Sequence, residues 1–86
     1  MPEISRFLGI VIAMYYKDHA PPHFHAKYGE FRTSISIEKL AVLDGELPSR
    51  VLALVMEWAS LHKNELMNDW NRAVQQEPLV KIEPLV

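Results

Sequence analysis

The chain has no cysteine, and this absence excludes several kinds of structure and chemistry. Disulfide bonds, metal sites built on thiolates and cysteine nucleophiles are all ruled out. The absence also fits a reducing compartment, and we expect the protein to be cytoplasmic.

Long hydrophobic runs are missing as well. The longest apolar run near the N-terminus covers residues 8–14, and no small-residue cleavage site follows it. A run of this length is too short to cross a membrane. We therefore expect neither a signal peptide nor a membrane-spanning segment.

Positive charge is not in excess. Nine Lys and Arg residues stand against eleven Asp and Glu residues, and the formal net charge is −2. Because no global basic field exists, nucleic-acid binding would need a local basic patch.

The composition that remains is that of an ordinary soluble globular protein, with 49% hydrophobic and 23% charged residues. The length of 86 residues predicts a single domain over residues 1–86. A chain of this size has room for one hydrophobic core.

The first half of the chain has the alternating pattern of β-strands. Residues 8–17 are apolar on both faces, which indicates a strand that is central in a sheet or covered by a helix. Pro21 and Pro22 then predict a loop, because proline cannot donate the hydrogen bonds of a sheet.

Residues 23–28 and 31–37 predict a β-hairpin around a two-residue turn at Gly29 and Glu30. This turn sets the register and places His25 opposite Ser34 and Lys27 opposite Arg32. The expected core face carries Phe24, Ala26, Tyr28, Phe31, Thr33, Ile35 and Ile37. The other face is polar, has no acidic residue, and carries His23, His25, Lys27, Arg32, Ser34 and Ser36.

A short fourth strand is expected at residues 41–43, before a turn at Asp44 and Gly45. Residues 48–76 then predict a helix that begins at Pro48. As one piece it would be about 42 Å long, whereas a domain of this size is about 30 Å across. The helix therefore either breaks near Lys63 or projects, exposing Trp70 to a partner.

The fold class that we expect is α+β. An antiparallel sheet of three to four strands, over about residues 8–44, packs against one long or broken C-terminal helix. Residues 79–82 are expected to add a short edge strand. Three acidic residues of the helix are expected on its solvated side, namely Glu57, Glu65 and Asp69.

A histidine cluster is the candidate for chemistry. His23 and His25 alternate on one strand and share a face, and His19 precedes them in the loop. The three imidazoles are candidate ligands for a divalent metal ion such as zinc, and candidate acid–base catalysts. Alternatively, they are solvated or hydrogen-bonded to the serines of the hairpin.

A pair of facing cations is the second candidate feature. Like charges opposite each other destabilise a sheet, and an anion between Lys27 and Arg32 would remove that cost. With Ser34 and Ser36 they form a candidate binding surface for phosphate groups or an acidic partner. Tyr15 lies near enough in the chain to stack on a base. Alternatively, the cations extend into water and the tyrosine belongs to the core.

Several segments resemble the bacterial domain-of-unknown-function family 4160. The most specific is the pattern formed by His19, Pro22, His23, Phe24 and His25. The others are residues 2–7, 9–12, 14–16, 45–48, 57–59 and 82–85. The resemblance implies a small stand-alone bacterial protein, often encoded beside a second small protein as in toxin–antitoxin modules. It brings no catalytic role with it.

Three functions follow as hypotheses. The first is the binding or regulatory component of a toxin–antitoxin-type two-protein module, with a small protein encoded nearby as its partner. The second is a small nuclease-like enzyme that uses histidines on RNA or another phosphate substrate. The third is a divalent-metal-binding module with His19, His23 and His25 as ligands.

Overall fold

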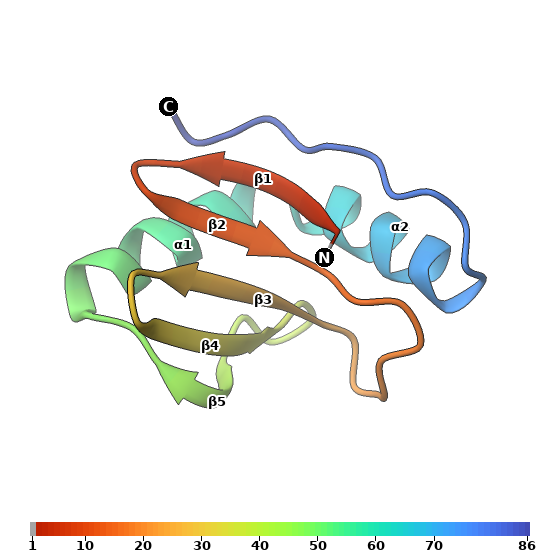
Figure 1. Cartoon of the computed structure of the whole chain (residues 1–86), viewed down its shortest axis with the longest axis horizontal. Helices are drawn as coiled ribbons and strands as arrows, with labels where there is room; N and C mark the ends of the chain where they lie inside the picture. The colour runs from red at the N-terminus through yellow and green to blue at the C-terminus, as the bar shows by residue number, and fades with distance from the viewer. Residues whose placement is uncertain (1) are drawn as a thin grey trace.

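The computed structural model describes residues 2–86 and has an α+β fold (Figure 1). Five antiparallel strands form one sheet whose order follows the chain: β1 Glu3–Phe7, β2 Ile10–Ala13, β3 His23–Tyr28, β4 Phe31–Ser36 and β5 Val42–Glu46. Two helices, α1 Ser49–Leu61 and α2 Lys63–Val74, lie on one face of the sheet. The expected fold class is correct, but the expected three to four strands are too few.

The first strand was missed because residues 8–17 are not one strand. Leu8 and Gly9 have φ angles of 51° and 79° and form a tight turn between β1 and β2. Two consecutive residues with positive φ are typical of the turns that join hairpin strands. The sheet therefore begins at Glu3, before the apolar run, and the run itself holds the turn at Leu8 and Gly9 followed by β2.

The hairpin of β3 and β4 has the expected register. His25 pairs with Ser34 and Lys27 pairs with Arg32. Most of the expected core face is buried, but Tyr28 and Phe31 remain 36% and 40% exposed. These two residues flank the turn, at the end of the sheet.

The fifth strand, β5, is longer than the segment expected at residues 41–43. It continues through Asp44 and Gly45, which were expected to form a turn. Gly45 has a φ of 77°, and a Cβ atom there would lie 2.1 Å from the carbonyl oxygen of Arg32. Only a glycine allows the two strands to approach so closely, which is why a turn-forming residue lies within a strand.

The helical segment breaks at His62, which separates α1 from α2. Of the two alternatives, the helix is therefore broken and does not project. Trp70 of α2 is buried with 7% exposure, and the longest dimension of the molecule is 33 Å. Among the described residues, no helix is long and apolar enough to cross a membrane.

The C-terminal tail runs beside β1 (Figure 1) but does not form the expected strand at residues 79–82. The backbone N–H of Ile82 donates to the carbonyl of Ile4, at 2.8 Å. The indole N–H of Trp58 donates to the carbonyl of Glu83 at the same distance. Asp69 is fully buried and accepts a hydrogen bond from the backbone of Val80, so the expectation that it is solvated was wrong.

The sheet face opposite the helices is the open face. Pairing across the strands places Val11, Lys27, Arg32 and Glu46 in one row on this face. The neighbouring row holds Ala13, His25, Ser34 and Asp44. Because β5 extends to Glu46, it brings two acidic residues to a face that was expected to have none.

Candidate metal centre

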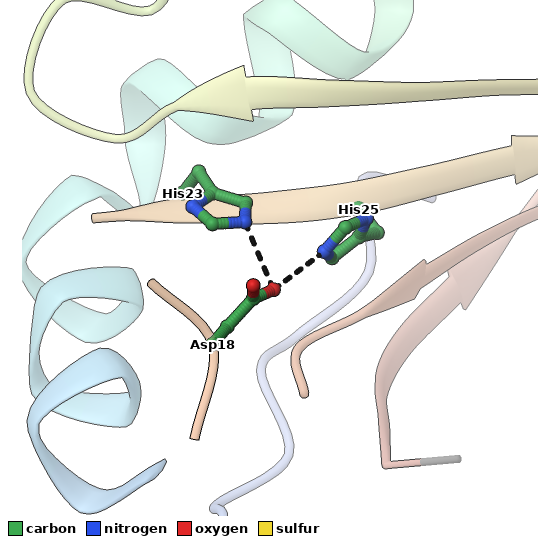
Figure 2. A group of neighbouring side chains, drawn as sticks. All are labelled: Asp18, His23 and His25. Atoms are coloured by element: carbon green, nitrogen blue, oxygen red, sulfur yellow. Dashed lines mark hydrogen bonds and ion pairs between the residues drawn. The ribbon is translucent and has the colours of Figure 1, made fainter. Parts of the chain in front are cut away.

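Three side chains converge at one end of the open face (Figure 2). The Oδ2 atom of Asp18 lies 2.9 Å from Nε2 of His23 and 3.0 Å from Nε2 of His25. The three donor atoms all lie within 4.8 Å of one another. One carboxylate oxygen therefore lies between two imidazole nitrogens.

Two elements supply this cluster. His23 and His25 are alternate residues at the start of β3, so both imidazoles leave the same face of the sheet. Asp18 comes from the loop between β2 and β3, whose Pro22 carbonyl accepts from the backbone of Ile37 at 3.1 Å. The backbone N–H of His19 donates to Oδ1 of Asp18, at 3.0 Å, which leaves Oδ2 for the two histidines.

Both ring nitrogens of His23 have partners. Its Nδ1 atom lies 2.7 Å from the carbonyl oxygen of Pro21. Since a carbonyl oxygen only accepts, Nδ1 must carry a proton and donate it. In a neutral ring, the Nε2 lone pair then faces the Asp18 carboxylate oxygen, and two acceptors oppose each other. Either a second proton on His23 or a cation between the two groups removes this conflict.

The donor atoms are a few tenths of an ångström closer together than the ligands of a zinc ion. Two ligands that lie about 2.1 Å from a tetrahedral zinc ion are about 3.4 Å apart. The separations of Asp18 Oδ2 from the two histidine nitrogens are 2.9 and 3.0 Å. Two histidines and one carboxylate form a ligand set used by zinc and by non-haem iron.

The cluster lies at the boundary between the core and the solvent. The side chain of His23 is 7% exposed, that of Asp18 is 17% exposed and that of His25 is 28% exposed. His23 also packs against the ring of Trp70, with 5.2 Å between ring centroids. The ring of His23 is thus fixed, while His25 borders the solvent.

The pKa of Asp18 reflects two opposing effects. Burial raises this pKa. Hydrogen bonds from His25 and from the backbone of His19, together with the nearby His23 ring, lower it by a larger amount. The net result is an Asp18 pKa below its ordinary value. The carboxylate is therefore charged at neutral pH and available as a ligand.

The third donor is Asp18, where the sequence suggested His19. The His19 side chain is 93% exposed, and its Nδ1 atom lies 3.2 Å from the other carboxylate oxygen, Oδ1. His19 thus stands outside the group of donors that the described residues form. A signal for Asp18 was present in the sequence. It is a carboxylate next to His19 in the same loop, five residues before His23.

The other predicted site residues divide into two groups. Lys27 and Arg32 are exposed on the open face, and the ring of Tyr15 meets that of His25 edge-on at 4.5 Å. The Ser34 hydroxyl lies 3.5 Å from Nδ1 of His25. Ser36 is apart from them, because it is buried and its hydroxyl accepts from the backbone of Lys39.

Two cavities flank the cluster. One, of about 370 Å³, is lined by Asp18, His23 and His25 among others. The second, of about 300 Å³, lies mainly over the open face and is lined by Val11, Ala13, Tyr15, His25, Lys27, Arg32 and Thr33. His25 borders both cavities, so a group bound in either one lies beside the cluster.

Fold and site together define a small α+β protein with a cluster of two histidines and one aspartate on an open sheet face. The chain belongs to the family described as Domain of unknown function (DUF4160), whose model matches residues 9–71. The expected family is thereby confirmed, and the matched segment contains all three residues of the cluster. No curated protein and no solved structure matches the chain.

Proposed function

We propose that this protein binds one divalent metal ion, with zinc as the first candidate, through Asp18, His23 and His25. The observation that carries the proposal is the contact of both His23 ring nitrogens with acceptor oxygens. Its Nδ1 donates to the Pro21 carbonyl, so in a neutral ring its Nε2 directs a lone pair at the Asp18 carboxylate 2.9 Å away. A bound cation would satisfy both of these acceptors.

The surroundings support the proposal. Histidine ligands in metal sites usually donate their second N–H to a carbonyl or another acceptor, as His23 does to Pro21. His25 has the Ser34 hydroxyl near its second nitrogen, and Asp18 is oriented by the backbone of His19. Each of the three ligands therefore has a group that fixes its orientation.

The number of ligands points to chemistry more than to structural support. Structural zinc sites have four protein ligands, whereas catalytic sites keep a position for water or substrate. Three protein ligands beside two cavities suit an ion that accepts an exchangeable group. Zinc in such a site activates its bound water at neutral pH.

A zinc titration of the chelator-treated protein tests the proposal. We expect about one zinc ion per chain, and a loss of affinity of more than about tenfold in His23→Gln and in His25→Gln. His19→Gln is the matched control, because His19 adjoins the cluster but contributes no ligand, and its zinc affinity stays unchanged. Thermal melts confirm that each variant is folded.

Two results contradict the proposal. One is a wild-type protein that binds no zinc and no other divalent ion and carries none after purification without chelator. The other is a His19→Gln variant that loses as much affinity as His23→Gln, since this would place the ion elsewhere.

A nuclease-like function without metal uses the same residues. The conflict at His23 also ends if this ring carries a second proton and pairs with Asp18, leaving His25 to act as an acid or base. This hypothesis predicts RNA cleavage by the purified protein that continues in the presence of a chelator and stops in His25→Ala. Cleavage that the chelator abolishes favours the metal centre instead.

A binding role in a two-protein module is the third proposal, and the exposure of β5 favours it. All five of its residues are exposed, and it lies at the edge of the sheet opposite to β1. An open edge strand is a surface on which another chain can pair. Co-purification with the small protein encoded nearby tests this role, and no complex at micromolar concentration contradicts it.

A further inference from the structure

We infer that the open-face cavity beside the metal centre binds a nucleoside phosphate, with the phosphate on Lys27 and Arg32. The inference rests on the proposed metal function, because it places the phosphate next to the bound ion. The unit that binds is a nucleoside monophosphate. It belongs either to a free nucleotide or to an RNA strand.

The two cations form the phosphate end of the cavity. Lys27 and Arg32 pair directly across β3 and β4, and both side chains are exposed. Within residues 2–86, neither of them forms an ion pair or a side-chain hydrogen bond. Two like charges held side by side repel each other, and a bound anion converts that repulsion into attraction.

The remainder of the cavity suits the base of a nucleotide. Val11 and Ala13 of β2 lie on the open face next to the cations, and Tyr15 follows at the end of the strand. Apolar side chains and an aromatic ring are the surfaces on which bases pack. The volume of about 300 Å³ falls in the range of small-molecule sites, and no Asp or Glu is among its lining residues.

His25 connects this cavity to the ion. It lies in the row next to Lys27 and Arg32, two residues before Lys27 on the same face of β3. Side chains so related are separated by about 6.5 to 7 Å at the backbone. A phosphate between the cations would therefore lie one side chain along β3 from an ion held by His25 Nε2.

A titration of the zinc-loaded full chain tests the inference with four probes. These are adenosine 5′-monophosphate (AMP), adenosine, inorganic phosphate and a 2′-O-methyl adenosine octamer that resists cleavage. We expect AMP to bind, phosphate to bind more than about tenfold more weakly, and adenosine to show no measurable binding.

Single substitutions distinguish phosphate binding in the cavity from binding of the metal ion. Lys27→Ala and Arg32→Ala are each expected to weaken AMP binding about tenfold or more while zinc stoichiometry stays at the wild-type value. Arg50→Ala is the matched control, since this exposed cation lies on α1 outside the cavity, and its AMP affinity is expected to be unchanged.

The octamer identifies the source of the phosphate. Binding more than about tenfold tighter than AMP points to an RNA strand, because further phosphates then contact the surface. Equal affinities point to a free nucleotide. Both results support the binding of a nucleoside monophosphate unit in this cavity.

A protein that binds zinc fully but shows no AMP binding at millimolar concentration overturns this inference and leaves the metal centre intact. AMP binding that is indifferent to both Lys27→Ala and Arg32→Ala also overturns it. If zinc does not bind, the same titration of the metal-free protein decides. AMP binding that depends on the two cations then supports the cavity while the metal proposal fails.

Discussion

Asp18 and His25 are seven residues apart in the chain, and Oδ2 of Asp18 lies 3.0 Å from Nε2 of His25. The contact joins the loop between β2 and β3 to the open face of the sheet. It also helps to hold the pKa of Asp18 below its ordinary value, although burial opposes this effect. The cluster therefore contributes to folding stability even without a ligand.

The stability of the metal-free protein should depend on pH through Asp18. Its pKa is depressed in the folded state, so its contribution is fully present above its ordinary value of 3.8. The contribution is lost as pH falls through the lower folded-state pKa. We expect wild type to exceed Asp18→Asn by about 1 to 3 kcal/mol in free energy of unfolding near neutral pH.

Urea unfolding of wild type and Asp18→Asn across the acidic range, with chelator present, measures this difference. The difference should persist down to about pH 4 and shrink below it. A difference that is zero across the whole range would show that the contacts of Asp18 do not stabilise the fold.

Gly45 should be the glycine at which a side chain is least tolerated. A Cβ atom there would lie 2.1 Å from the Arg32 carbonyl oxygen, and its φ is 77°. We expect Gly45→Ala to cost about 2 kcal/mol or more in free energy of unfolding, measured by urea denaturation. Gly29→Ala is the control, with a φ of 57° but no atom within 4 Å of the added Cβ, and should cost about 1 kcal/mol. Equal costs would mean that backbone conformation, and not the close approach of the strands, sets the penalty.

Glu46 should weaken the binding of phosphate at Arg32. The two residues are paired across β4 and β5, so the carboxylate lowers the positive potential of the neighbouring cation. We expect Glu46→Gln to raise AMP affinity about two- to threefold, with Glu38→Gln in the turn after β4 as a neutral control. A fall in affinity would indicate that Glu46 instead positions Arg32 for binding.

Asp69 should anchor the C-terminal tail. Its Oδ1 atom accepts from the Arg72 guanidinium at 2.8 Å and from the backbone N–H of Val80 at 2.9 Å, and its side chain is buried. We expect Asp69→Ala to cost about 3 kcal/mol in free energy of unfolding, because two donors lose a charged acceptor. The exposed Glu57→Ala on α1 is the control and should cost less than about 0.5 kcal/mol. A neutral Asp69→Ala would mean that the apolar contacts of the tail suffice to hold it.

The sequence contained enough information to predict the hairpin. Alternation with period two on both sides of Gly29 and Glu30 left one register, and the structure has it. That register also placed His23 and His25 on one face and Lys27 beside Arg32. Local patterns of this kind are predictable because the side-chain period and the turn length together fix the pairing.

The other strands depend on contacts that the local pattern does not encode. Residues 8–17 are apolar throughout, so the turn at Leu8 and Gly9 was concealed within a hydrophobic run. Gly45 lies in β5 because of its close approach to Arg32, which only the assembled sheet reveals. In both places a glycine in the printed sequence was the available signal.

The role of Asp18 could not be derived from periodicity, because loop residues have none. The loop before Pro22 directs the Asp18 side chain back toward β3 and leaves that of His19 in solvent. Asp69 is a similar case, since its burial results from the tail that returns along α2 and β1. Long-range contacts decided both positions.

Anomalous diffraction at the zinc absorption edge, from crystals grown with zinc, tests the central claim most directly. We predict one strong peak about 2.0 to 2.2 Å from Asp18 Oδ2 and from the Nε2 atoms of His23 and His25. A map without a peak at these atoms would contradict it. So would a sole peak at another histidine, such as His62 beside Glu65, whose atoms Nδ1 and Oε1 are 2.6 Å apart.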